Sequence, residues 1–365
     1  MSAPTGPDPS APAPPPGEGA VRRRRLIAVV LTLVLVAGVA VAAMLFRPAD
    51  TAPSAATQSP TETVTPTPTP TPEPPPAPAP PPPPEPIAEL PPVAMNVLVI
   101  GSDSRGNARD QAAHTAATAE SQDHRSDALM LVHVPADRRT VQVISIMRDL
   151  WVNIPAYGGA KINTSLQVGG IPMVVRTVES LLSTHVDHTV MLDFAGFKTL
   201  TDALGGIAVD VPLPFQSTHD TQHVFTPGVN HLNGQAALEF VRERYAFIEG
   251  DYQRVRNQQT YLRAVLARLT GGGALNDVNV VRSLVDMAGP FLTVNQGFDA
   301  VSVAILGYGL RNLDPNACTF FTLPTAGIGT VGGASVVLPD YGGIGAVSAA
   351  LNEGRLAEYA AAAGL

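Results

Sequence analysis

The sequence predicts a mixed α/β domain over residues 93–365, with a central β-sheet flanked by helices on both faces. Two observations lead to this prediction. Short apolar runs typical of buried strands interleave with longer segments whose apolar residues recur at helical spacing, as in sheets covered by helices. The hydrophobic content of 45% is also ample for a core of this size.

The first half of the domain is predicted to begin with three strands. The run Val97–Ile100 breaks at Gly101 into the polar residues SDSR, as expected of a buried strand that delivers a loop at its carboxyl end. The runs DALMLVHV and TVQVISI follow, and the turn PADRR between them favours a strand pair. A helix is predicted over GGIPMVVRTVESLLS, with Pro172 near its start, then a strand over HTVMLDF and a short helix over AGFKTLTDALGG.

The second half is predicted to be helical before it returns to strands. LNGQAALEFV is a predicted helix, and DYQRVRNQQTYLRAVLARLTGGG is a longer one with a glycine stop. A helical pattern near VVRSLVDMAGPFL precedes the strand-like segments CTFFTLP and GASVVLP. Cys318 is the single cysteine, so no internal disulfide can form, and we expect it to be buried and without a catalytic role.

The residues before the domain predict a membrane anchor and a spacer. Leu26–Phe46 carries no charged residue, and at about 1.5 Å per residue it covers roughly 30 Å of hydrocarbon, enough for a transmembrane helix. A cleaved signal peptide is the alternative, although its apolar region is typically only about 7 to 15 residues. Arginines concentrated before the span place a disordered tail, residues 1–25, in the cytoplasm. The Pro-rich residues 47–92 are then an extended extracytoplasmic linker.

Two aspartates are predicted to lie at the ends of neighbouring strands, where ligands usually bind to such sheets. Asp103 follows the first strand, and Asp127 precedes the second. Carboxylates brought close together repel each other unless a cation or a proton lies between them, and a hard divalent ion is the common solution. The spacing alone leaves open that both are ordinary loop residues.

Arginines form a second group of candidate site residues. On a helix that begins near Asp251, Arg254, Gln258 and Tyr261 fall on one face, whereas Arg256 leaves on another side. The side chains of Arg242 and Arg244 would point about 200° apart on a helix but to the same side of an extended segment. If both serve one site, the preceding helix must therefore end before them. The group consists of Arg148, Arg242, Arg244, Arg254 and Arg256.

Arginines beside paired carboxylates suit a phosphate or a pyrophosphate, because guanidinium groups bind its oxygens in a bidentate manner. Nucleic acid is the rival ligand. The formal net charge of -8, the scarcity of lysine in the domain and the predicted external location argue against nucleic acid.

Six motifs occur in order between about Asn96 and Arg268: NVLVIGSDSR, RSDALMLVHV, VISIMRDLWVNIPAYGGAKINTSLQVGG, DFAGFKTLTDALGGIAVDVP, GVNHLNGQAALEFVRERY and GDYQRVRNQQ. Their sequence and order resemble those of the LytR-CpsA-Psr (LCP) family. The resemblance implies the LCP fold, a mixed sheet flanked by helices around an apolar lipid-binding cleft. It also implies an enzyme, a phosphotransferase that moves a cell-wall glycopolymer from a polyprenyl-pyrophosphate carrier onto peptidoglycan. Residues 93–365 would be the catalytic domain, held outside the cell membrane by the predicted anchor.

The resemblance also implies roles for individual residues. Asp103 and Asp127 would bind a metal ion, which would be magnesium, with manganese as the alternative ion. Asp251 would be a further polar residue of the site, and our own hypothesis is that it is the base that accepts the proton of the attacking sugar hydroxyl, with Arg254 holding its orientation. The pyrophosphate-binding set would be Arg105, Arg148, Arg242, Arg244, Arg254 and Gln258, and the residues that act in catalysis would be Arg148, Asp251 and Arg254. Lys161 lies in a matching motif without a defined role. Two positions depart from the family pattern: Met147 replaces the usual proline, and Arg256–Asn257 replaces an arginine directly before the glutamine.

Two other functions remain open. The protein could be a non-catalytic envelope regulator that binds polyprenyl phosphate lipids, or a polyprenyl pyrophosphatase that uses water as the acceptor.

Overall fold

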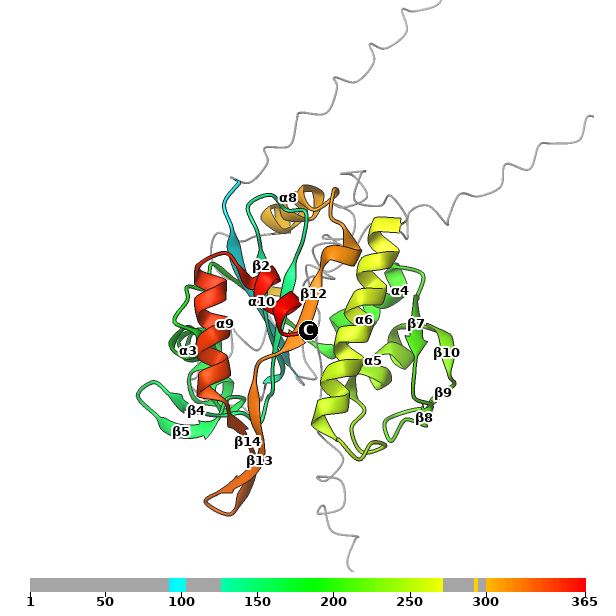
Figure 1. The fold of residues 1–365 in the computed structure, drawn as a ribbon. Coiled ribbons are helices and arrows are strands. Elements are labelled where there is room, and N and C mark those ends of the chain that lie inside the picture. The colour runs from blue at the N-terminus through cyan, green and yellow to red at the C-terminus, as the bar shows by residue number, and fades with distance from the viewer. Residues whose placement is uncertain (1–91, 103–125, 272–291, 295–299) are drawn as a thin grey trace, which may run out of the picture.

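The computed structural model describes residues 92–102, 126–271, 292–294 and 300–365. Within these residues the centre of the fold is a six-stranded sheet in the order β11-β6-β1-β2-β3-β12 (Figure 1). β1 is parallel to β6 and β3 is parallel to β12, whereas the other neighbours are antiparallel. The predicted mixed sheet is therefore confirmed. The strands are β1 (Met95–Ser102), β2 (Ser126–Val134), β3 (Gln142–Ile146), β6 (His188–Leu192), β11 (Leu292–Val294) and β12 (Thr319–Thr322).

Helices cover both faces of the sheet and form a core with each face. Successive side chains of a strand point to opposite faces, so they enter different cores. Val97 and Val99 of β1 pack in one core, whereas Leu98 and Ile100 pack in the other. Strands that are buried on both faces need apolar residues at successive positions, which explains the continuous apolar runs in the sequence. The first core contains α4 (Phe194–Ala203), α5 (Gly234–Arg242) and α6 (Asp251–Gly271), and the second contains α3 (Thr164–Leu182), α9 (Tyr341–Asn352) and α10 (Leu356–Ala362).

Short strands form ribbons outside the central sheet. The predicted strand GASVVLP is β14 (Ala334–Pro339), and it pairs with β13 (Thr325–Val331) in a hairpin that projects from the body of the domain (Figure 1). The remaining elements are the pairs β4 (Trp151–Ile154) and β5 (Gly158–Lys161), β7 (Ile207–Val211) and β10 (Gly228–Leu232), and β8 (Phe215–Gln216) and β9 (Val224–Phe225), with α8 (Ala300–Gly309) and the short 3₁₀ turn η6 (Pro315–Ala317).

Helix α3 differs from its prediction at the start. It begins at Thr164 rather than near Pro172, and it kinks where Gly169 and Gly170 leave helical geometry. Gly170 has a φ of 62°, which a glycine adopts without strain, and Pro172 then lies in the first turn of the straight part. The predicted helix over residues 280–292 lies almost entirely outside the described residues.

Two further expectations concern the anchor and the cysteine. No helix in the described part of the chain is long and apolar enough to cross a membrane, and the predicted span 26–46 lies outside that part. Cys318 is half-buried rather than buried, and its thiol lies 3.3 Å from the carbonyl oxygen of Asp314. Burial raises the pKa of Cys318 to about 11, so the thiol is protonated at neutral pH.

The buried carboxylate of Glu239 holds the loop between β8 and β9 against α5. It accepts hydrogen bonds from the backbone N–H groups of Thr221 and His223, at 3.0 and 3.1 Å, and from the side chain of Gln235 at 3.0 Å. Burial alone would raise the pKa of Glu239, but the hydrogen bonds from Gln235, Thr221 and His223 outweigh it and lower the pKa to about 2.

This lowered pKa predicts an acid-labile contribution to stability. Because the pKa of Glu239 is lower in the folded chain than its ordinary value of 4.5, the carboxylate stabilises the fold above pH 4.5, and this stabilisation is lost as the pH falls toward 2. We expect Glu239→Gln to lower the free energy of unfolding at pH 7 by roughly 2 kcal/mol and to flatten the acid limb of stability. Urea unfolding between pH 2 and pH 7 measures both effects. An acid limb as steep in the variant as in the wild type would contradict the assignment.

Candidate active site

The ends of three neighbouring strands, β1, β2 and β3, lie at one edge of the sheet, where the first candidate residues are found. Ser102 at the end of β1 pairs with Ser126, the neighbour of Asp127, and Ile146 at the end of β3 pairs with Leu129 of β2. Arg148 follows β3 at the same edge. Asp103 and Arg105 lie outside the described residues.

Arg148 links the sheet edge to the start of α6. Its Nη1 donates a short hydrogen bond to Asp127, and its Nε donates to Asp251 Oδ2 at 3.3 Å. Burial would lower the pKa of Arg148, but the carboxylates of Asp127, Asp251 and Asp149 outweigh it and raise the pKa above its ordinary value. The guanidinium is therefore charged, and it joins residues more than a hundred positions apart in the chain.

Asp251 lies at the centre of three guanidinium groups, which we call the arginine cluster (Arg148, Arg244 and Arg254). Besides Arg148, Arg254 Nη2 donates to Oδ2 of Asp251 at 3.0 Å, and Arg244 Nη1 donates to Oδ1 at 3.3 Å. Burial would raise the pKa of Asp251, but the charges of Arg254, Arg148 and Arg244 outweigh it and lower the pKa. The carboxylate is thus ionised at neutral pH. The structure therefore brings Arg148, Arg244, Asp251 and Arg254 together from distant parts of the chain.

The arginine cluster has more hydrogen-bond donors than the described residues satisfy. Arg254 is 1% exposed, and its Nε and Nη1 have no hydrogen-bond partner among the described residues; the same holds for Nε of Arg244. Among the described residues, the ion pairs of the cluster are with Asp127 and Asp251, and with Asp149 at a longer 3.8 Å from Arg148 Nε. Burial lowers the pKa of Arg254 to about 10, which still leaves it protonated at neutral pH. Buried donors without acceptors are costly unless a ligand supplies the acceptors, so the cluster is suited to bind an anion.

Arg242 is placed differently from Arg244. Helix α5 ends at Arg242, and Glu243 is already extended, so the two arginines are not both on the helix. Arg242 pairs with Asp220 at 3.2 Å and lies over the ring of Phe194, 4.4 Å from its centre. Phe194 follows β6 at the same edge of the sheet, so Arg242 lies at this edge but is paired with a carboxylate other than Asp251.

Gln258 and Asn257 hold the end of α5. Gln258 Nε2 donates to the carbonyl of Val241 at 3.2 Å, and Asn257 Nδ2 donates to the carbonyl of Phe240 at the same distance. The last carbonyls of a helix have no partner within the helix, so these two amides satisfy groups that would otherwise be buried without a hydrogen bond. The contact that the structure gives Gln258 is structural, and its predicted part in pyrophosphate binding stays a prediction.

This contact predicts a stability defect. We expect Gln258→Ala to lower the free energy of unfolding by about 1–3 kcal/mol, because it leaves the buried carbonyl of Val241 unsatisfied. Arg256→Ala is the control, since that side chain points to solvent from the same helix and pairs with Glu249. Chemical denaturation compares the two variants. Wild-type stability together with weaker pyrophosphate binding in Gln258→Ala would instead favour the ligand role.

Glu243 is a site-forming residue that the sequence reading missed. Its Oε1 accepts the backbone N–H groups of Arg244, Tyr245 and Ala246, at 2.8, 2.7 and 3.0 Å. One buried carboxylate therefore shapes the turn that carries Arg244 to Asp251. The signal in the sequence is the acidic residue between two arginines in RER, which reads equally well as a solvated face.

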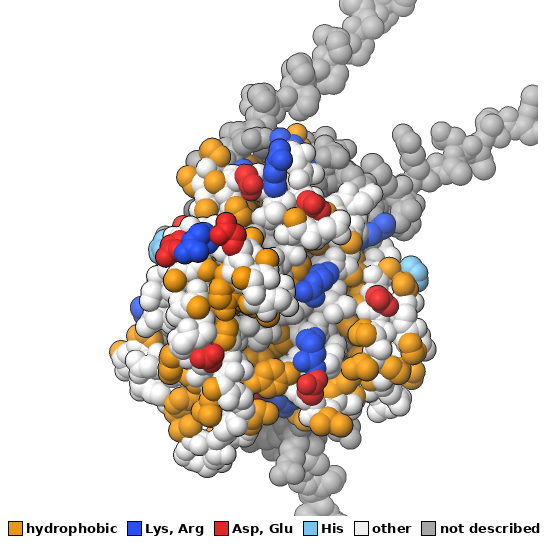
Figure 2. Space-filling view, in the orientation of Figure 1, with side chains coloured by type: hydrophobic (Ala, Val, Ile, Leu, Met, Phe, Trp, Pro, Cys, Tyr) orange, Lys and Arg blue, Asp and Glu red, His pale blue; other side chains and the backbone are white. Residues whose placement is uncertain are grey.

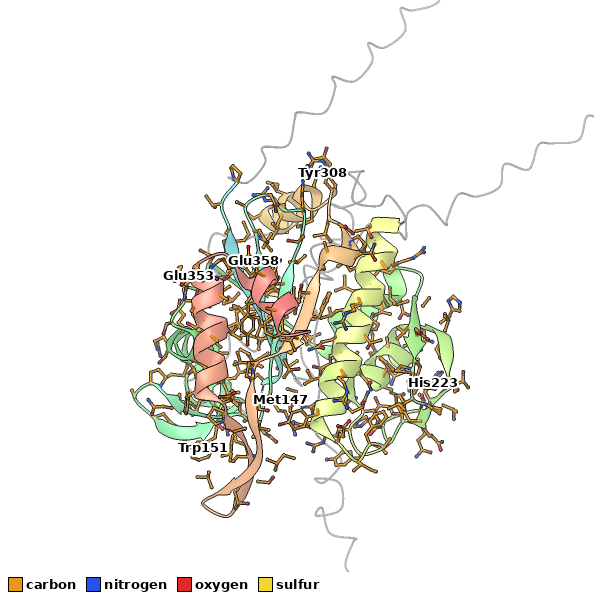
Figure 3. The ribbon with its side chains drawn as sticks, viewed as in Figure 1. Met147, Trp151, His223, Tyr308, Glu353 and Glu358 are labelled. Carbon is orange, nitrogen blue, oxygen red and sulfur yellow. The ribbon has the colours of Figure 1, made fainter. Side chains whose placement is uncertain are left out.

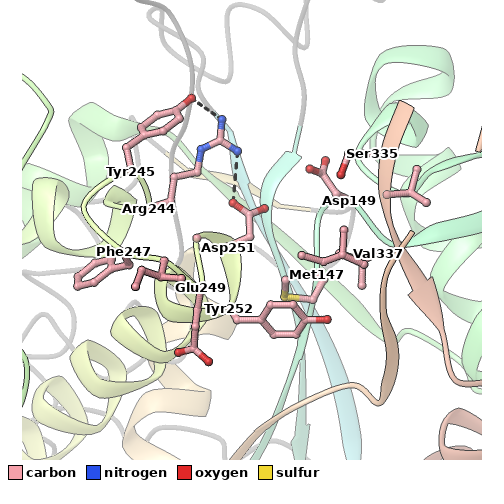
Figure 4. A pocket seen from close by; sticks show the side chains of 14 residues that line it. Met147, Asp149, Arg244, Tyr245, Phe247, Glu249, Asp251, Tyr252, Ser335 and Val337 are labelled. Atoms are coloured by element: carbon pink, nitrogen blue, oxygen red, sulfur yellow. Dashed lines mark hydrogen bonds and ion pairs between the residues drawn. The ribbon is translucent and has the colours of Figure 1, made fainter. Parts of the chain in front are cut away.

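A pocket of about 440 Å³ opens beside Asp251 (Figure 4). Arg244 stands at its border and donates to both Asp251 and the hydroxyl of Tyr245. Met147, where the family pattern has proline, is buried in its wall. Lys161 lies outside the lining residues, 3.5 Å from the carboxylate of Asp149. The residues that line the pocket are Met147, Asp149, Arg244, Tyr245, Phe247, Ile248, Glu249, Gly250, Asp251, Tyr252, Ile328, Ser335, Val336 and Val337.

Of the two aspartates predicted to bind a metal ion, only Asp127 lies among the described residues. Carboxylate oxygens are the ligands that magnesium prefers, and Asp127 supplies them at the sheet edge, with 2% of the residue exposed. Within the described ranges no group of three or more His, Cys, Asp or Glu side chains is arranged so that it could hold a metal ion. The donor chemistry of Asp127 fits a hard cation, while Asp103, its predicted co-ligand, lies outside the described residues.

Comparisons with known proteins agree with this architecture. The cell wall biosynthesis protein LcpA of Corynebacterium glutamicum is 29% identical over 287 residues, which cover 68% of this chain and 53% of LcpA. The polyisoprenyl-teichoic acid–peptidoglycan teichoic acid transferase TagU of Bacillus cereus is 31% identical over 207 residues, covering 56% of this chain and 62% of TagU. The chain thus spans little more than half the length of these relatives.

The fold also matches solved structures. The crystal structure of TagV from B. subtilis superposes with a TM-score of 0.58 at 24% identity, over 72% of this chain and 97% of TagV. The family model described as LytR_cpsA_psr family matches residues 88–352, a longer span than the motifs in the sequence cover. This match extends over most of the chain and includes every element of the site, and the protein therefore belongs to the LytR-CpsA-Psr family.

Proposed function

We propose that this protein is a membrane-anchored phosphotransferase that moves a cell-wall glycopolymer from a polyprenyl-pyrophosphate carrier onto peptidoglycan. The observation that carries the proposal is the arginine cluster around Asp251, with buried donors that no described residue accepts. Guanidinium groups in this arrangement suit a pyrophosphate. The relative TagU is named as a transferase of polyisoprenyl-linked teichoic acid to peptidoglycan, which supports this choice of donor and acceptor.

Substrate binding would use donors that are already in place. Nε and Nη1 of Arg254 would donate to phosphate oxygens, and Arg148 and Arg244 would share their charge between Asp251 and the substrate. Because the side chains are held by packing and ion pairs, little reorganisation accompanies the reaction. Arg105, Arg242 and Gln258 remain proposed members of the pyrophosphate-binding set, as the family resemblance implies.

In the transfer step a sugar hydroxyl of peptidoglycan attacks the phosphorus that carries the glycopolymer. A new P–O bond forms, the anhydride P–O bond breaks and polyprenyl phosphate leaves, while the hydroxyl proton passes to Asp251. Arg148 and Arg254 stabilise the negative charge on the phosphate oxygens in the transition state. The low pKa of Asp251 makes it a weak base, which suits a loose transition state in which the hydroxyl keeps its proton until late.

Asp127, together with Asp103, would hold magnesium, or manganese in its place. Bound there, the cation would neutralise charge on the pyrophosphate oxygens. We place the domain outside the cell membrane, with residues 26–46 as a single span, the N-terminus in the cytoplasm and residues 47–92 as the spacer. The lipid chain would occupy the predicted apolar cleft.

A reconstituted reaction tests the proposal. The purified full-length protein is incubated with magnesium and a polyprenyl-pyrophosphate-linked glycopolymer, with and without peptidoglycan. We expect polymer joined to peptidoglycan, and polyprenyl phosphate in equal amount, only when the acceptor is present. Phosphate release without acceptor would favour the pyrophosphatase, and lipid binding without either product would favour the regulator.

A further inference from the structure

The pocket beside Asp251 is walled by three segments that lie far apart in the chain. The turn after β3 supplies Met147 and Asp149, residues 244–252 supply the wall between α5 and α6, and the β13–β14 hairpin supplies the side opposite α6. Figure 3 shows Met147 between this hairpin and the start of α6. The hairpin follows the six sequence motifs in the chain, so this wall of the pocket comes from a segment that the motifs do not include.

The hairpin is tied to both of the other walls. The backbone N–H of Val337 donates to the carbonyl of Asp149 at 2.8 Å, and Val337 also forms a bridge with Leu150. On the other side, the hydroxyls of Tyr252 and Thr325 lie 2.9 Å apart and share a hydrogen bond. These contacts hold the three walls of the pocket to one another, and a pocket held in this way needs little ordering when a ligand binds.

The charges of the pocket discriminate between ligands. Three carboxylates line it, those of Asp149, Glu249 and Asp251, against one cation, Arg244, which is already paired with Asp251 at 3.3 Å. Lys161 and Arg256, which pair with Asp149 and Glu249, do not line it. An anionic phosphate would therefore meet mainly carboxylates. An isoprenoid chain would bury these carboxylates against hydrocarbon, which is costly. Neutral hydroxyl groups can donate hydrogen bonds to carboxylates, so a sugar suits this lining.

The apolar part of the pocket also suits a sugar ring. Tyr245 and Ile328 line it with 63% and 70% of each residue exposed, and Tyr252 also lines it. Figure 2 shows hydrophobic side chains gathered around the lower end of α6 and the β13–β14 hairpin. Aromatic and aliphatic side chains can pack against the C–H face of a sugar while its hydroxyl edge faces the carboxylates. The exposed rim leaves room for a polymer whose neighbouring units extend into solvent.

Asp251 lies at the boundary between this pocket and the buried part of the arginine cluster. Arg254 approaches Asp251 from the side of the core, and Asp149 and Ser335 face Asp251 across the pocket (Figure 4). We propose that the pocket binds the hydroxyl-bearing sugar of the acceptor glycan and presents that hydroxyl to Asp251. This inference rests on the proposed function, which it deepens by assigning the acceptor to the face of Asp251 opposite the buried arginines.

The test uses the full-length protein and glycan strands released from peptidoglycan and stripped of peptides. Binding of these strands is measured by saturation-transfer NMR, and the KM values for strands and lipid-linked donor are measured in the transfer reaction. We expect Ile328→Asp to weaken strand binding and raise the acceptor KM by about tenfold, with the donor KM within about twofold of the wild type. Thr330→Asp is the matched control, because Thr330 is exposed on the same hairpin but does not line the pocket.

A second pair of variants separates the ring of Tyr245 from its hydroxyl. Tyr245→Ala is expected to lose about tenfold in strand affinity, and Tyr245→Phe, which keeps the ring but equally lacks the bond to Arg244, less than about threefold. A raised donor KM with an unchanged acceptor KM would place the donor in the pocket and overturn the proposal, as would unchanged strand binding in Ile328→Asp and Tyr245→Ala. Variant-sensitive strand binding by a protein that performs no transfer would retain the pocket and reject the proposed function.

Discussion

Arg254→Met is expected to reduce the rate of glycopolymer transfer by about 100- to 1,000-fold while the free energy of unfolding stays within about 1 kcal/mol of the wild type. Arg254 is buried, and two of its donor nitrogens have no partner among the described residues, so its charge costs stability in the free protein. Methionine fills a similar volume without that cost, although Asp251 then loses one of its three arginine partners. A site that binds a charged ligand is expected to contain a residue that lowers the free energy of unfolding of the free protein but is needed for the reaction.

The matched control is Arg256→Met, two positions along the same helix. Arg256 points to solvent and pairs with Glu249 and Gln253 instead of Asp251. Initial transfer rates and urea unfolding are measured for both variants. Equal losses of activity in the two variants would show that general positive charge on α6, and not the buried position of Arg254, is what the reaction needs.

Asp251→Asn is expected to lower kcat by at least about 100-fold and to leave the KM for the lipid-linked donor unchanged or lower. The amide cannot accept the hydroxyl proton, which accounts for the slower turnover. It also removes one negative charge from among three guanidinium groups, so an anionic donor should bind at least as tightly. This division between kcat and KM is the signature of a group that acts in the transition state.

Kinetics with varied donor at saturating acceptor measure both constants, and Glu353→Gln is the control. Glu353 is an exposed carboxylate paired with an arginine, Arg355, away from the lining of the pocket. Full turnover in Asp251→Asn would remove Asp251 from the role of base. A raised donor KM with unchanged kcat would mean that the carboxylate serves only to orient the arginines.

The helix patterns show how far local sequence reaches. Arg254, Gln258 and Tyr261 were predicted to share a face of α6 from their spacing, and all three are buried there, while Arg256 is exposed on another side. Helical periodicity is a property of neighbouring residues, so the spacing determines which side chains point together. The same reasoning could not say what that face would meet, and Gln258 contacts the end of α5.

Other elements depended on contacts between distant residues. Helix α9 was not predicted, because its sequence YGGIGAVSAALN combines three glycines with small residues and has weak helical propensity, yet Ile344, Val347 and Leu351 pack in a core against the sheet. The strand GASVVLP was recognised, but its partner was not. The segment GASVVLP forms a hairpin with β13 and does not join the main sheet. β12 is therefore the last strand of that sheet.

The sequence by itself determined the fold class, the strands that carry site residues to one edge, and the side chains that α6 turns inward, because periodicity and apolar content act over a few neighbouring residues. Only the tertiary structure decided how charges and polar groups pair. It placed Asp251 among Arg148, Arg244 and Arg254, gave Arg242 to Asp220, and used Glu243 to shape the turn before α6. These pairings depend on distances between residues far apart in the chain and on the burial that strengthens their interaction, and no local pattern records either quantity.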